Sequence, residues 1–296
     1  MLKKIAFLTI FLAQVVYVHA QGIQFGVHVD PFISFLDSDY SKIKGSGVNG
    51  GTALGVEMDY AFDATGNYSL TFGLDFSLNN GGTLLYEYGG ILLPNSELDN
   101  RSSFRNYADL QPNSSSGIDM KAFTKINYRM NYIEIPVGLK LRTNELGGSY
   151  MRAFFHIPLI KIMIPVTAGA KIFSPDADAV GFYRDSSSTK YAVPEGTESI
   201  KEPNVWKDIT PIQLSVGAGA GVEFTPNSDG GLRLYAGIYY HSGLIDMTGA
   251  FTGQTEFTSA KNVDNPDNSP STSVNTQTRN PRNAMHNVAL RIGVIF

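Results

Sequence analysis

The chain has 296 residues, no cysteine and a formal net charge of −4 at pH 7. This charge balance argues against a nucleic-acid-binding protein, which would carry a basic patch. The absence of cysteine excludes disulfides, thiol catalysis and cysteine-based metal sites. With 30 glycines and only 17% charged residues, the composition favours an all-β protein rich in turns.

Residues 1–20 predict a secretory signal peptide that is cleaved after Ala20. Lys3 and Lys4 form its positive start, and an apolar run from Ile5 to Val18 follows. That run is short for a membrane span of about 20 residues, which disfavours a helical anchor. We therefore expect an exported domain of residues 21–296.

Eight segments alternate apolar and polar residues, as a strand with one apolar face does. They are residues 22–30, 54–62, 70–78, 131–143, 161–172, 212–224, 232–241 and 288–296. Each is roughly 9–12 residues long, the length of a tilted strand that crosses a bilayer. Residues 151–160 are ambiguous, because they fit either an extension of the fifth strand or the turn before it.

Two features favour a membrane barrel over a soluble sandwich. Every segment carries glycine on its polar face, where a narrow barrel interior needs small residues. The gaps after the second, fourth and sixth segments are short, whereas the others are longer, the last three being roughly 50, 40 and 45 residues long, as in barrels with short periplasmic turns and long external loops. The long gaps include residues 79–130, 173–211 and 242–287. We predict a closed, eight-stranded, antiparallel up-and-down transmembrane β-barrel.

The polar faces carry charged residues, which the barrel would gather in its lumen. They are Asp30, Glu57, Asp59, Asp75, Glu134, Lys140, Arg142, Lys171, Glu223, Arg233 and Arg291. Buried charges must pair or hydrogen-bond, so we predict a structural ion-pair network that fills a barrel without an open pore. The alternatives are a proton or ion path and an enzyme site within the wall.

Other candidates for chemistry are weaker. Gly217, Gly219 and Gly221 lie within a strand and lack the spacing of a dinucleotide-binding loop, so lumen clearance explains them better. His28 and His241 point inward on the pattern. His241 and Asp246 form the one pair that suggests a rim protease, but their spacing is not diagnostic.

Further residues could act near the barrel ends. Asp264 and Asp267 could bind calcium, although their spacing is not that of an EF-hand loop. Trp206 could anchor at the lipid interface or contact a partner. An interfacial aromatic girdle is predicted from aromatic residues near the strand ends on the apolar face: Tyr60, Phe62, Phe76, Phe224 and Tyr240. No cofactor motif is present in the sequence.

Several segments resemble the PorT-like outer-membrane β-barrel family. NYIEIPVGLKL resembles the family's E-I-P strand, and VTAGAKIF the strand that follows it. IQLSVGAGAGVEF and LRLYAGIYYHSGLIDM resemble two later strands, and NVALRIGVIF the last. The resemblance implies an eight-stranded barrel, a role for Phe296 in the signal read by the barrel-insertion machinery, and, more weakly, support of a secretion pathway.

The sequence therefore predicts a non-enzymatic barrel in the outer membrane of a Gram-negative bacterium. We expect it to act through its external loops as a scaffold or binding platform for an envelope or secretion partner. Its surroundings would be outer-membrane lipid, without nucleic acid. The alternatives are a barrel enzyme (a protease or a lipid-modifying enzyme), a narrow channel, and a soluble periplasmic β-protein.

Overall fold

The computed structural model describes residues 22–40, 43–92, 121–147, 150–175, 195–202, 204–226, 231–248, 255–258, 276–277 and 282–296. The predicted signal peptide lies outside these ranges. None of the described residues forms a helix long and apolar enough to cross a membrane.

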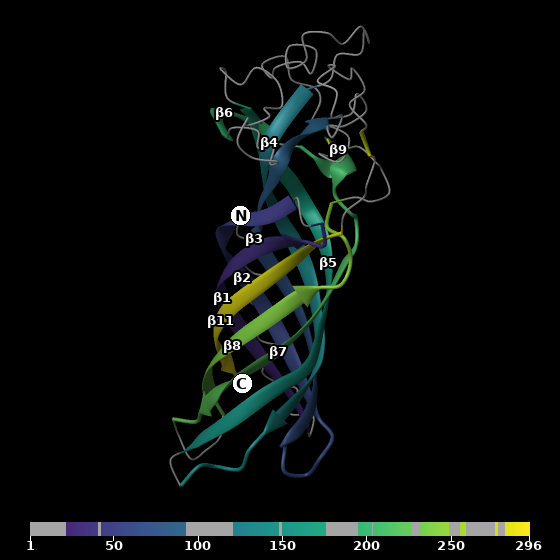
Figure 1. The fold of residues 1–296 in the computed structure, drawn as a ribbon. Coiled ribbons are helices and arrows are strands. Elements are labelled where there is room, and N and C mark those ends of the chain that lie inside the picture. Colours follow the sequence, from purple (N-terminus) through teal and green to yellow (C-terminus); the bar gives the residue numbers. More distant parts are fainter. Residues whose placement is uncertain are drawn as a thin grey trace, which may run out of the picture.

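Eight antiparallel strands form a ring, which confirms the predicted fold class (Figure 1). In ring order they are β1 (Ile23–Ser38), β2 (Ile43–Ala61), β3 (Tyr68–Leu92), β4 (Lys121–Arg142), β5 (Met151–Pro175), β7 (Gln213–Phe224), β8 (Arg233–Gly243) and β11 (Asn283–Ile295). Because β11 pairs with β1 and β3 pairs with β4, the ring closes without a free edge. Outside the ring, β6 (Glu195–Glu202) pairs with β5, β9 (Thr255–Thr258) with β3, and β10 (Thr276–Gln277) with β9.

The apolar face of the sheet points outward and its charged face points inward. Ile133 and Leu290 are 39% and 44% exposed, whereas their neighbours Glu134 and Arg291 are 3% and 2% exposed. The same outward apolar band continues around the ring. A soluble β-barrel would bury these apolar side chains, so hydrocarbon is the environment that this surface fits.

The strands are longer than predicted, which corrects the expected loops. The strands β3 and β5 have 25 residues each and β4 has 22, so they extend into the segments 79–130 and 173–211 that were predicted as loops. The first external connection, predicted as one of the longer gaps, is only residues 39–42 because β1 and β2 continue past the apolar band. The periplasmic turns 62–67, 143–150 and 225–232 are short, as expected.

Two prolines interrupt the alternation in β5. The register with the neighbouring strands shifts between His156 and Leu159, around Pro158, and again beside Pro165. Proline cannot donate to the ladder and is tolerated in strands at such bulges. Residues 151–160 are therefore part of the fifth strand, and their alternation is obscured by the bulge at Pro158.

Beyond the apolar band the barrel has an apolar interior. Side chains from several strands fill it: Leu36, Ile43, Leu84, Tyr86, Ile126, Tyr128, Met130, Tyr132, Met163, Ala168, Ala170, Ile172, Val205, Ile209, Met247 and Met285. We call this set the external core. The alternation of segment 161–172 places Ala168, Ala170 and Ile172 on its apolar, lipid-facing side. This prediction was wrong, since the bulge beside Pro165 turns them inward. The external end of the barrel is thus packed like a soluble domain.

Candidate functional site

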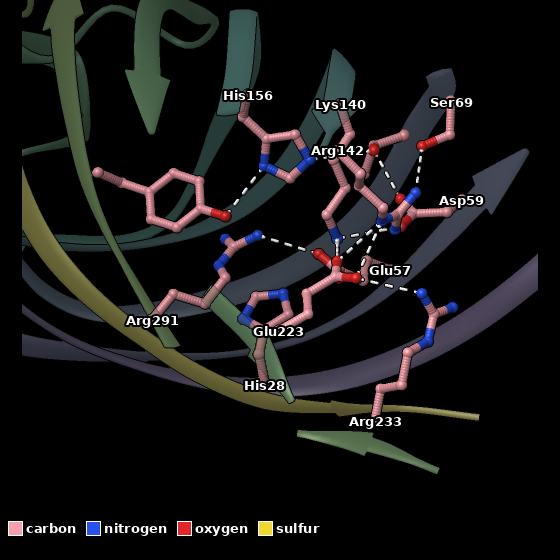
Figure 2. Close-up of polar contacts among 12 residues, drawn as sticks. His28, Glu57, Asp59, Ser69, Lys140, Arg142, His156, Glu223, Arg233 and Arg291 are labelled. Carbon is pink, nitrogen blue, oxygen red and sulfur yellow. Dashed lines mark hydrogen bonds and ion pairs between the residues drawn. The ribbon is translucent and has the colours of Figure 1, made fainter. Parts of the chain in front are cut away.

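The charged interior is built by all eight ring strands, and Arg291 on β11 is its first centre (Figure 2). Its guanidinium group donates to Asp30 of β1 at 2.7–3.1 Å, and its terminal nitrogens also lie 3.3 Å from Glu57 and Asp75. The ring of Tyr239 lies 4.7 Å from the guanidinium carbon. One buried cation therefore holds three carboxylates from three strands, a geometry for which the planar fork of arginine is suited.

Lys140 and Arg142 on β4 form the second centre (Figure 2). The Lys140 ammonium lies 3.0 Å from Asp59, 3.3 Å from Glu223 and 3.4 Å from Glu57. Arg142 donates to Glu223 at 2.9 Å, to Ser69 at 2.7 Å and also to Asp59. Because Glu57 contacts both Lys140 and Arg291, the two centres form one network.

Further ion pairs lie at both ends of the charged interior. Arg233 lies 3.1 Å from Glu223 near the periplasmic mouth, and its side chain is the most exposed of the network cations. At the other end, Lys161 contacts Glu134 at 2.8 Å, and Ser77 donates to the same carboxylate at 2.5 Å. Lys161 is missing from the predicted set, although its position on the polar face of the alternating segment 161–172 was enough to find it.

Ten of the eleven predicted lumen residues point into the charged interior, and Lys171 does not. After the bulge beside Pro165, alternation in β5 continues in the opposite phase, so Lys171 faces outward. Its ammonium lies 4.9 Å from the centroid of the Phe173 ring, on the outer side of the barrel. The prediction that Lys171 points into the lumen was wrong because the sequence pattern was extended across Pro165 without a shift.

Neutral side chains complete the network. His156 contacts Thr71 at 3.2 Å and Tyr239 at 2.9 Å through its two ring nitrogens, and Thr71 donates to Asp59 at 2.6 Å. His156 lies in the ambiguous segment, so the sequence pattern could not place it. Such hydrogen bonds satisfy carboxylate oxygens that the cations do not reach, as buried charges require.

A cluster of His28, Asp30 and Asp75 brings three metal-ligating side chains together. One ligand atom from each residue lies within 4.8 Å of the others. However, Arg291 already contacts both carboxylates. A metal cation would have to compete with that guanidinium group for the same oxygens, so the donor set does not fit a metal site.

The candidate protease pair is not assembled. His241 is buried, and its Nδ1 has no hydrogen-bond partner among the described residues. Asp246 instead accepts hydrogen bonds from the backbone of Asn283 at 2.9 Å and of Thr248 at 3.1 Å. Burial raises the pKa of Asp246 above its usual value, partly offset by these hydrogen bonds. Its geometry is that of a loop-fixing carboxylate.

The glycines of β7 allow aromatic rings into the lumen. A Cβ atom added at Gly219 would lie 2.2 Å from the ring of Tyr239, which is too close for any side chain. This ring also contacts His156 and Arg291. The glycine stripe therefore gives the network its space, as lumen clearance predicted.

Several predicted surface residues are exposed. All five predicted girdle residues, Tyr60, Phe62, Phe76, Phe224 and Tyr240, face outward. Phe296 is exposed as well, and its backbone N–H donates to Phe25 at 2.8 Å, while its role as an insertion signal stays a prediction. Trp206 lies in the short 3₁₀ helix η2 (Trp206–Asp208) and is 39% exposed. Asp264 and Asp267 lie outside the described residues, as does much of the predicted loop 242–287.

A closed antiparallel ring with an apolar outer band and a charged interior defines an integral β-barrel of the Gram-negative outer membrane. No protein-family model matches the chain, and no curated protein matches it. Similar solved structures include Neisserial surface protein A (9% identity, 93% of this chain and 98% of that chain, TM-score 0.33). Others are Ail, the attachment invasion locus protein of Yersinia pestis (11%, 94% and 100%, TM-score 0.34), and the outer membrane protease OmpT of Escherichia coli (11%, 94% and 97%, TM-score 0.28). At such identities and TM-scores neither activity nor partners transfer, and the fold assignment rests on the pairing of the strands.

Proposed function

We propose that this chain is a PorT-like, non-enzymatic barrel that supports a binding platform at its external end. The observation that carries the proposal is that the lumen is filled along its length. The charged network occupies the part within the apolar band, and the external core occupies the part beyond it. In a filled barrel, the surfaces available to a binding partner outside the lipid are those at its two ends.

The external end is built for this role. The strands β3, β4 and β5 carry ordered backbone beyond the apolar band, and β6 and β9 add to that end of the sheet (Figure 1). Sites on strands are held more rigidly than sites on loops. The partner we infer is a protein of the envelope or of a secretion machinery, in line with the family that the E-I-P segment of β4 resembles.

Two features disfavour the alternatives. The carboxylates that could serve as acids or bases are held by Arg291, Lys140 and Arg142 in the interior, away from any substrate in the lipid or outside. A cavity of about 10 Å³ beside Glu134, Lys161 and His241 is only large enough for about one water molecule, which is not a conducting path.

Site-specific crosslinking from the native envelope tests the proposal. A photoreactive amino acid would replace Ser46, exposed at the external end of β2, and in a matched variant Leu146, exposed in a periplasmic turn. We expect one discrete envelope protein to crosslink from position 46 and not from position 146. Crosslinks to that protein from position 146 alone would contradict the proposal, as would stepwise ion conductance of the purified barrel in a planar bilayer.

A further inference from the structure

The outer wall of β4, β5 and β6 carries basic residues just beyond the apolar band. Arg129 on β4 is exposed and lies on the same face as Ile133, four residues further out. Lys171 on β5 faces outward beyond Val166, and Lys201 on β6 is its direct cross-strand partner. We call Arg129, Lys171 and Lys201 the basic cluster.

The charges of the basic cluster are not neutralised within the described parts of the chain. Like charges directly opposite each other destabilise an antiparallel pair, and Lys171 and Lys201 are in that position. The Lys171 ammonium lies 4.9 Å from the centroid of the Phe173 ring on the same outer wall. No carboxylate in the described ranges forms an ion pair with any member of the basic cluster. An external anion would remove this repulsion.

The height of the basic cluster on the barrel identifies the anion. Ile133 and Val166 are the last exposed apolar residues on β4 and β5 before the polar part of each strand. Four residues from Ile133 to Arg129 correspond to about 13 Å along a tilted strand, which reaches the headgroup region of the outer leaflet. Trp206 is exposed at the same level, because the N–H of Val205 donates to Ala168 at 2.9 Å. Tryptophan is enriched at this interface.

We propose that Arg129, Lys171 and Lys201 bind the phosphorylated headgroup of an outer-leaflet lipid, whose acyl chains would lie on the apolar band below. Arginine provides a planar fork for a phosphate group, and the two lysines provide point charges on the neighbouring strands. This lipid site is independent of the partner inferred for the external end.

The test is a titration of the folded barrel, in neutral detergent, with diphosphoryl lipid A, followed by native mass spectrometry. The same lipid after removal of its phosphates is the second probe. We expect the triple variant Arg129→Gln, Lys171→Gln, Lys201→Gln to bind diphosphoryl lipid A on the order of a hundredfold more weakly. This estimate takes about fivefold per basic residue, the equivalent of about 1 kcal/mol near an anionic surface.

Two controls keep the test decisive. Arg152→Gln removes one cation at the periplasmic end of β5, where Arg152 lies 3.6 Å from Glu145, and it should bind like the unmodified chain. The single variant Arg129→Gln, with a loss of about fivefold, replaces the triple variant if the latter does not fold. Equal binding of the dephosphorylated lipid, or unchanged binding by both basic-cluster variants, would overturn the proposal.

Discussion

The buried pair Lys161–Glu134 offers a direct test of the charged interior. Replacing Lys161 with Met keeps a side chain of similar length but removes the cation that lies 2.8 Å from Glu134. Ser77 would remain as the hydrogen-bond donor to that carboxylate. Lys161→Met therefore leaves a buried carboxylate without its cation while changing the packing little.

The magnitude follows from distance and burial. Two unit charges 2.8 Å apart attract by about 6 kcal/mol at an effective dielectric constant of about 20. Desolvation offsets much of this attraction, but breaking a buried pair from one side typically costs about 3–5 kcal/mol. The adjoining cavity of about 10 Å³ admits about one water molecule, so solvation of the unpaired Glu134 is limited. We expect a loss of about 3–5 kcal/mol in the free energy of unfolding.

The second step of the test neutralises the partner. In the double variant Lys161→Met, Glu134→Gln, the amide oxygen still accepts from Ser77 and no charge is buried, so most of the lost stability should return. Urea titration in detergent, with the folded fraction read from gel mobility, measures all three barrels. A matched exposed pair, broken by Arg152→Gln, should cost at most about 1 kcal/mol. A double variant no more stable than Lys161→Met would refute the reasoning.

Three further predictions address packing, lipid contact and a periplasmic turn. Gly219→Ala should lower the free energy of unfolding by about 1–3 kcal/mol in the same urea assay, because the added Cβ would lie 2.2 Å from the ring of Tyr239. Gly50→Ala should be tolerated, because no atom lies within 4 Å of its added Cβ. Ile162→Arg, on the apolar band, should lower the free energy of unfolding by about 2–4 kcal/mol, whereas Thr167→Arg, beyond the band, should lower it by about 0–1 kcal/mol. Equal losses in the two variants would mean that lipid does not surround the barrel. The Thr65 hydroxyl and three backbone N–H groups lower the pKa of Asp63 to about 2, so a carbon NMR titration should place its midpoint there. The stability that Asp63→Asn loses at pH 7 should therefore vanish as the pH falls through about 2.

The alternation of apolar and polar residues was sufficient to predict the ring. It works because the side-chain period of a strand is two, so a single strand such as residues 131–142 shows which face meets lipid. The same alternation predicted that Glu134, Lys140 and Arg142 point into the lumen. The alternation cannot identify the ion-pair partner of each charged residue. Arg291 and Asp30, for example, are distant in sequence and meet only when the ring closes.

The alternation changes phase where a strand contains a β-bulge. In β5 the bulge beside Pro165 reverses the two faces, which moved Lys171 from the predicted lumen to the outer wall and turned Ile172 inward. The bulge at Pro158, nearer the periplasm, changes the phase in the same way, and for this reason the sequence pattern did not place His156 in the lumen. Proline alone does not predict such a change of phase, because Pro31 in β1 and Pro136 in β4 lie in strands whose pairing register is unchanged around them.

The external core shows why the length of the strands was underestimated. Within lipid, an inward side chain can be charged only if the network pairs it, and an outward one must be apolar. Beyond the lipid an outward side chain can be polar, and on β4 the inward positions change from Glu134 and Lys140 to Tyr128 and Met130 while the alternation along β4 continues. A search for segments with an apolar outward face ends at that point, although the strand continues. On β4 this change falls between Glu134 and Tyr132, next to Ile133, and Arg129 of the basic cluster lies four residues further out than Ile133.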